Sequence, residues 1–184
     1  MSKKILVLIL AVACLSFAPN SDFDRSYKHM ASGTTFPKKV GSFLIIGPTL
    51  FDEKGMDVGI GYTRRGIEIT QYIYPAVGSN ENSLVDEEYE KCKNYILEDN
   101  PFSGIIEETD YTFNGVKGEC LKYEDIALFH ESYQRLISYL YIFEDKGWFI
   151  KIRISHRSDK RESSLNKIDE YLENIPWPTL KRER

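Results

Sequence analysis

The sequence is poor in the residue types that most often carry chemistry, with three histidines and three cysteines among 184 residues. His29, His130 and His156 show neither the H-E-x-x-H spacing nor a C-x-x-C partner that would indicate a metal site. His130 precedes Glu131 directly, so on a strand the two side chains would point apart. We interpret all three as solvated histidines, and the sequence predicts no metal, no cofactor and no catalytic residue.

An excess of basic residues is also missing. The chain has 24 lysines and arginines against 28 acidic residues, a formal net charge of −4. Removal of a leader that contains Lys3 and Lys4 would leave 22 basic against the same 28 acidic residues, or −6. Nucleic-acid affinity comes largely from a positive footprint, so this balance argues against nucleic acid as a partner. It also argues against adsorption to an anionic lipid surface.

No apolar run near the N-terminus is long enough to cross a bilayer, which takes about 20 residues. Residues 5–13 are nine uninterrupted apolar residues that follow Lys3 and Lys4. A basic start, a short apolar run and a small-residue exit together indicate a secretory signal peptide. The sequence therefore predicts a signal peptide over 1–13 and export of the rest.

The residues around Cys14 leave two outcomes for the mature N-terminus. The stretch 11–14, Ala-Val-Ala-Cys, resembles a lipobox, although Ala11 stands where leucine is usual, and it predicts lipidation of Cys14 and a membrane anchor. The competing cleavage site at Ser16-x-Ala18 is followed by Pro19, which fits poorly in a peptidase cleft. A soluble periplasmic or secreted form is the alternative. Residues 14–35 lack sustained periodicity and are interpreted as a tether.

Residues 36–178 read as a single α+β domain, followed by a charged tail over 179–184. Alternating apolar residues predict strands near 43–46 and over 56–64, 66–76, 103–113, 116–125, 131–143 and 148–155. Asn114-Gly115 is a strong hairpin signal, and turns are also expected at 64–66 and 145–147. The strand over 131–143 is apolar on both faces, so both faces should be covered.

Two helices are predicted, over 83–101 and about 160–175. The first carries Val85, Tyr89, Cys92 and Ile96 on one face, and the second carries Leu165, Ile168, Leu172 and Ile175. Ser83 is the expected N-cap of the first helix. Each helix needs a sheet face, so we expect a mostly antiparallel sheet flanked by the two amphipathic helices.

The order of elements resembles the PsbP-like fold. The resemblance rests on G-x-x-G-E-C-L at 115–121, the paired strands LISYLYIF at 136–143 and GWFIKIRIS at 147–155, and a closing helix that ends near IPW at 175–177. It implies an α/β/α sandwich and a non-enzymatic accessory or binding role. The chain also resembles uncharacterised bacterial exported proteins through FPxxVGxF at 36–43 and YxYP at 72–75, which implies no function.

Two sets of residues are candidates for sites in the domain. Export would place Cys92 and Cys120 in an oxidising compartment, where they could form a disulfide, or they are two reduced buried residues. Neither has the electropositive surroundings of a reactive thiol. Basic residues also gather on and after the last strand and form a candidate partner surface; they are Lys151, Arg153, Arg157, Lys160 and Arg161. A solvated face is the alternative interpretation.

Taken together, these patterns favour an envelope accessory or binding protein that is not an enzyme. It would be held at the membrane by Cys14 and would act on an envelope protein partner through a surface. A periplasmic hydrolase of envelope polymers is the alternative, and it would require a Ser/His pair or two carboxylates that converge in a cleft.

Overall fold

The computed structural model describes residues 25–77, 83–159 and 162–182. The expected signal peptide, Cys14, most of the expected tether, Lys160 and Arg161 lie outside these ranges. An eight-stranded sheet has the order β3-β4-β5-β6-β10-β9-β8-β7, and every neighbouring pair is antiparallel. Its strands are β3 (Lys39–Val40), β4 (Phe43–Leu50), β5 (Val58–Arg64), β6 (Ile67–Pro75), β7 (Gly104–Phe113), β8 (Val116–Phe129), β9 (Ser132–Asp145) and β10 (Trp148–Arg157).

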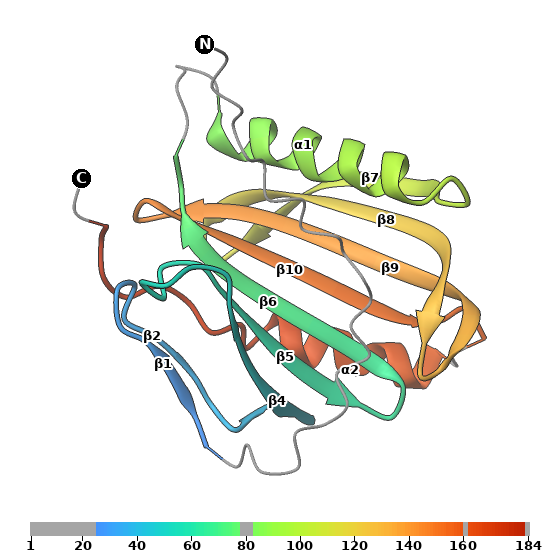
Figure 1. The fold of residues 1–184 in the computed structure, drawn as a ribbon, viewed down its shortest axis with the longest axis horizontal. Coiled ribbons are helices and arrows are strands. Elements are labelled where there is room, and N and C mark those ends of the chain that lie inside the picture. Colours follow the sequence, from blue (N-terminus) through green and yellow to red (C-terminus); the bar gives the residue numbers. More distant parts are fainter. Residues whose placement is uncertain (1–24, 78–82, 160–161, 183–184) are drawn as a thin grey trace.

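Helices α1 (Leu84–Asp99) and α2 (Glu162–Leu172) cover opposite faces of this sheet (Figure 1). The smaller core lies under α1 and joins Tyr89 to Leu140 and Ile142 of β9. The larger core lies under α2, where Leu172 packs with Phe143 of the same strand. The predicted antiparallel sheet between two amphipathic helices is therefore confirmed, with β9 buried on both faces.

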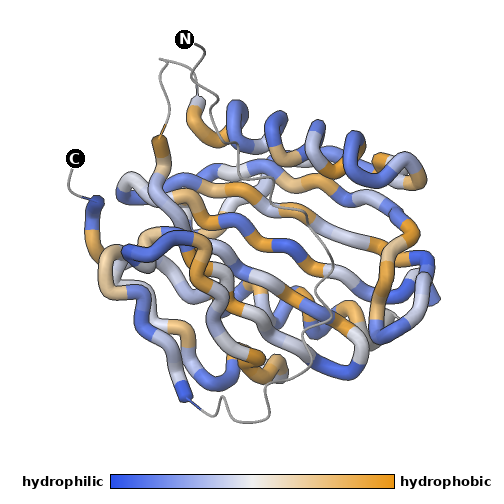
Figure 2. The backbone as a smooth tube through the Cα atoms, in the orientation of Figure 1, coloured by the Kyte–Doolittle hydropathy of each residue, from blue (hydrophilic) through white to orange (hydrophobic). Residues whose placement is uncertain are grey.

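Local sequence signals set several of the element boundaries. Ser83 caps α1, and its side chain accepts a hydrogen bond from the Asp86 amide at 3.4 Å. Apolar and polar residues alternate along α1, as Figure 2 shows, so one side of the helix can pack on the sheet. The hairpin turns at Arg65-Gly66, Asn114-Gly115 and Lys146-Gly147 have positive φ at both central residues. This is the turn whose twist matches that of the flanking strands.

The expected tether is ordered from residue 25 on, which differs from the sequence analysis. Strands β1 (Tyr27–His29) and β2 (Thr34–Phe36) form an antiparallel hairpin, and His29, Ser32 and Thr34 in it are buried. The His29 Nε2 donates to the Gly55 carbonyl at 2.9 Å, and Nδ1 lies 2.7 Å from the Ser32 hydroxyl. These strands are too short to show a period, and they gain stability from contacts with distant segments.

The expected charged tail is also held in place over 179–182. The Thr179 and Leu180 amides donate to the Ser32 carbonyl at 2.9 and 2.8 Å, so the tail contacts the β1–β2 hairpin. The Arg182 amide donates to the Lys146 carbonyl at 2.8 Å, and the Trp148 indole donates to the Leu180 carbonyl at 3.2 Å. We call residues 176–182 the C-terminal strap.

Candidate functional site

The predicted basic surface is divided by the structure, because two of its members pack on the sheet. Lys151 and Arg153 are half-buried on the α1 side of β10. The Lys151 ammonium lies over the rings of Tyr72 and Tyr74, 4.6 and 5.2 Å from their centroids. Arg153 donates to the Tyr123 hydroxyl at 3.0 Å. Both cations therefore make contacts within the fold, Lys151 by cation–π interaction and Arg153 by a hydrogen bond.

Arg157 is exposed and meets a cation that the sequence analysis did not select. The ends of β9 and β10 form a shallow polar depression of about 340 Å³ that includes both Arg157 and Arg135. Its lining residues are Ser132, Gln134, Arg135, Arg157, Ser158 and Asp159. The Ser158 amide donates to the Arg135 carbonyl at 3.1 Å, which joins the two strand ends. We call this region the arginine depression.

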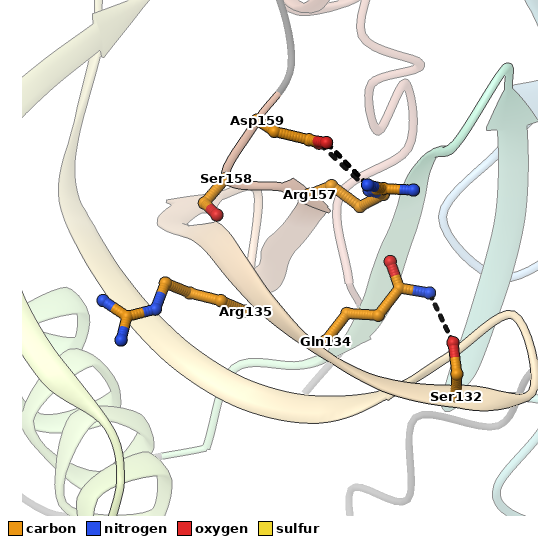
Figure 3. A pocket seen from close by; sticks show the side chains of 6 residues that line it. All are labelled: Ser132, Gln134, Arg135, Arg157, Ser158 and Asp159. Carbon is orange, nitrogen blue, oxygen red and sulfur yellow. Dashed lines mark hydrogen bonds and ion pairs between the residues drawn. The ribbon is translucent and has the colours of Figure 1, made fainter.

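The side chains of the arginine depression do not converge on one point. Figure 3 shows Arg157 directed towards Asp159 and Gln134 directed towards Ser132, while Arg135 extends away from the other side chains. The Arg157 Nε donates to Asp159 at 3.0 Å, and Arg135 lies 3.3 Å from Glu124. Both ion pairs are solvent-exposed, so each is worth only about 0–1 kcal/mol and can be exchanged for a carboxylate of a partner.

Exposed apolar side chains lie next to the arginine depression. Leu128 and Tyr133 are directly opposite each other on β8 and β9, and Ile126 is opposite Arg135. Tyr133 is 78% exposed, Ile126 41% and Leu128 40%. We call Ile126, Leu128 and Tyr133 the apolar rim. The other tyrosines of the eight-stranded sheet are buried or half-buried, so an exposed tyrosine beside two aliphatic residues marks a surface suited to contact.

The turn between β8 and β9 is conformationally costly. Its central residues, His130 and Glu131, both have positive φ, at 47° and 70°. Neither is glycine, so the left-handed conformation costs of the order of 1 kcal/mol or more at each. The His130 Nε2 lies 3.5 Å from Glu68. The strained turn holds the start of β9, and therefore Ser132 and Tyr133, in one position.

The hydrolase alternative requires a reachable nucleophile and base. The sequence analysis missed the His29–Ser32 pair, whose ring nitrogen and hydroxyl are 2.7 Å apart. Both residues are fully buried, and burial also lowers the pKa of His29. A substrate cannot reach a hydroxyl that is sealed in this way. Within residues 25–77, 83–159 and 162–182, no three His, Cys, Asp or Glu side chains are grouped to hold a metal ion.

The predicted disulfide between Cys92 and Cys120 is wrong, because both thiols are free. Cys92 packs in the core under α1, together with Leu121, whereas Cys120 belongs to the core under α2. Cys120 and Leu121 are neighbours on β8, so their side chains point to opposite faces of the sheet. The face of β8 that carries Cys120 is covered by α2, whereas Cys92 belongs to α1. Burial raises the pKa of both thiols.

Of the arginine depression and the apolar rim, only Arg157 was selected from the sequence, and Arg135 and Tyr133 are the most important of the residues that were not. The first four residues of their strand, Ser132 to Arg135, are mostly polar, while residues 136–143 are mostly apolar on both faces. That change marks the point at which β9 leaves the covered part of the sheet. It is the signal that could have indicated an exposed strand end.

None of the helices in the described part of the chain combines the length and the apolar character needed to span a bilayer.

The fold is similar to that of several solved structures at low sequence identity. Cyanobacterial PsbP (CyanoP) from Synechocystis has a TM-score of 0.50 and 13% identity, over 80% of this chain and 88% of that chain. A Pseudomonas aeruginosa protein of unknown function has a TM-score of 0.49 and 12% identity, over 84% and 97% of the two chains. The Ran-binding protein Mog1p of Saccharomyces cerevisiae has a TM-score of 0.43 and 13% identity, over 78% and 82%.

No protein-family model and no curated protein matches the sequence. The expected resemblance to the PsbP-like fold is confirmed at the level of structure. At these identities the similarity establishes the fold alone.

Proposed function

We propose that the chain is a non-enzymatic binding protein of the cell envelope that holds a protein partner at the arginine depression and the apolar rim. The observation that carries this proposal is the exposed Tyr133 side chain, which lies on the same face of β9 as Arg135, at a sheet end whose other face carries Arg157. Aromatic residues and arginines are enriched in protein interfaces, and they carry much of the binding energy there.

The chemistry of the surface selects the kind of partner. The guanidinium groups of Arg135 and Arg157 hold exposed carboxylates of the same chain, and a partner's carboxylates could replace them. The apolar rim needs an apolar side chain from that partner to remove it from water. We therefore assign a partner that presents aspartate or glutamate next to an apolar residue. The PsbP-like resemblance, which implies an accessory role, supports this reading.

The anchor completes the proposal. The expected signal peptide ends before Cys14, and acylation there would attach the domain to a membrane by a short segment. More than one acyl chain is needed for stable attachment, since each buried CH₂ contributes about 0.8 kcal/mol. The mass of the mature N-terminus tests this part, with a Cys14→Ser variant fractionated beside the wild type. An unmodified N-terminus at Pro19, or wild type found wholly in the soluble fraction, would disprove the anchor.

Crosslinking in intact envelopes tests the surface. We expect a specific adduct of the tagged wild type that is lost in an Arg135→Glu/Arg157→Glu variant. The control is Lys28→Glu/Lys54→Glu, which reverses two exposed charges of the described chain outside the depression. Equal loss of the adduct in both variants would show that overall charge, and not this surface, controls the contact.

A further inference from the structure

Strand β7 forms a long open edge of the sheet. It spans ten residues and is the last strand in the sheet order, with β8 as its neighbour. Residues 105–110 are all exposed. The opposite edge strand, β3, has two residues. An edge strand presents unpaired backbone N–H and C=O groups along its outer side, which can pair with another extended chain.

Acidic side chains follow this edge on both faces of the sheet. Glu108 and Asp110 lie on the α1 side, and Glu107 lies on the other side. Burial raises the pKa of Glu119, which is opposite Asp110, and the negative charges of Asp110 and Asp86 raise it further. Lys93 pairs with Glu108 at 2.9 Å, and on the other face Lys122 of β8 is directly opposite Glu107. The excess of negative charge therefore lies on the α1 side of the edge, at Glu108, Asp110 and Glu119.

The charge pattern disfavours a second copy of the chain as the strand that covers this edge. Antiparallel pairing of two β7 strands about a central two-fold axis, perpendicular to the sheet, brings equivalent residues face to face. Registers centred on residues 107, 108 or 110 place Glu107, Glu108 or Asp110 directly against the same residue of the other copy. Like charges directly opposite each other destabilise a strand pair, so self-association is disfavoured.

We propose that β7 accepts an extended, lysine- or arginine-rich segment of another protein as a ninth strand of the sheet. In antiparallel addition, residues opposite Asp110 and Glu108 lie two positions apart in the added segment and share the α1 face. The same segment then reaches the exposed Ile106 and Ile105, where a β-bulge of β7 shifts the register. The matching segment is basic-x-basic-x-apolar. This edge is separate from the arginine depression, so the inference does not depend on the proposed function.

The alternative role for these acids is protection of the edge against aggregation, since charged side chains commonly block edge strands. Protection and strand addition predict different results when a basic extended peptide is added. Protection alone gives no ordered complex with any peptide, whereas strand addition requires backbone pairing along β7. The probe is a blocked peptide of sequence Thr-Lys-Thr-Lys-Thr-Val-Thr, compared with the same peptide in which prolines replace the threonines and remove their N–H groups.

An NMR titration of the full chain at low salt separates these outcomes. We expect the threonine peptide to shift and protect the backbone amides of 105–111, and the proline peptide to leave them unprotected. Asp110→Lys should weaken binding about tenfold, because it replaces an attractive cross-strand pair by a repulsive one. Glu53→Lys, an exposed acid in the β4–β5 loop, is the matched control and should leave the affinity unchanged.

Three results would overturn the proposal. Amides of β7 that stay unprotected at a saturating concentration of the threonine peptide would show that the edge only resists pairing. Equal binding of the proline peptide would show a purely ionic contact without strand addition. Equal weakening by Glu53→Lys would show that the effect follows net charge and does not depend on the position of the charge on β7.

Discussion

At the scale of single residues, the buried chain of hydrogen bonds from His29 to Thr34 fixes the β1–β2 hairpin. A carbonyl can only accept, so the contact to Gly55 requires the His29 proton on Nε2. The neutral ring then accepts from the Ser32 hydroxyl through Nδ1, and Ser32 lies 2.7 Å from the Thr34 hydroxyl. Because the ring is buried, the neutral form of His29 is favoured in this network.

This arrangement predicts a pH dependence. Burial lowers the pKa of His29, while the Gly55 and Met56 backbone groups and Asp52 oppose the shift. The unfolded chain takes up the proton near its ordinary pKa of about 6.5, and the folded chain resists it. Stability should therefore be unaffected by this residue above about pH 6.5 and should fall as the pH drops below it.

Urea unfolding of wild type and His29→Gln at several pH values measures this effect. Burial raises the pKa of Glu68 and Asp125, and these two groups therefore stabilise the folded state as the pH falls. Because both proteins share this effect, the quantity to follow is the difference between their free energies of unfolding. We expect the wild type to lose stability relative to the variant between about pH 6.5 and 5. A difference that does not change with pH would contradict the role of His29.

Leu172 is the second residue whose contribution can be measured. It is 3% exposed and packs on the larger core with Ile168 of α2 and with Ile175, which follows the helix. Leu172→Ala should lower the free energy of unfolding by about 2–5 kcal/mol, because it leaves a cavity in a packed interior. Leu44→Ala is the control, since Leu44 is 52% exposed, and its effect should stay within about 0.5 kcal/mol. An unchanged urea midpoint for Leu172→Ala would mean that α2 does not carry the core.

At the scale of elements, the C-terminal strap connects segments that are distant in the sequence. It bonds to the β1–β2 hairpin through Thr179 and Leu180, and to the β9–β10 turn through Arg182. The Gln71 amide donates to the Pro176 carbonyl at 2.6 Å, and the Tyr171 hydroxyl donates to Gln71 at 3.1 Å. The strap thus ties the end of α2 to both hairpins.

Truncation after Pro178 should loosen the first hairpin while the eight-stranded sheet stays folded. The truncated chain loses the two amide donors to the Ser32 carbonyl. We expect the backbone amides of 27–36 to exchange with solvent at least about tenfold faster, because local opening then costs less free energy. Removal of residues 183–184 alone is the control. Unchanged exchange rates after the longer truncation would show that the hairpin is held by its own contacts.

The elements with strong local signals were predictable, and those held by distant contacts were not. Ser83 starts α1 and Asn114-Gly115 turns β7 into β8 because capping and turn chemistry act within a few residues. Most of the β1–β2 hairpin was expected to be a tether, because its strands are short and the segment shows no sustained apolar periodicity. Their burial comes from the strap and from Trp148, whose ring lies 5.2 Å from that of His29.

At the scale of the whole molecule, the parts of the candidate surface that depend on contacts between distant segments could not be predicted from the sequence either. Arg157 was predicted from its place after an alternating strand, but Arg135 gives no local signal, and only strand pairing brings it to the same depression. Lys151 and Arg153 were predicted to share a surface with Arg157, yet both are used for packing on the sheet. The Cys92–Cys120 pairing failed for a related reason, since periodicity does not indicate which helix covers which face.

We have proposed that the arginine depression and the apolar rim contact a protein partner in the envelope. A photo-crosslinking amino acid placed at Tyr133, which is 78% exposed, would capture that partner. The same group at Lys28, exposed on β1, is the control. We expect a discrete adduct of one mass from position 133, none from position 28, and loss of the adduct when Arg135→Glu is added. No adduct from position 133, or the same adducts from both positions, would contradict it.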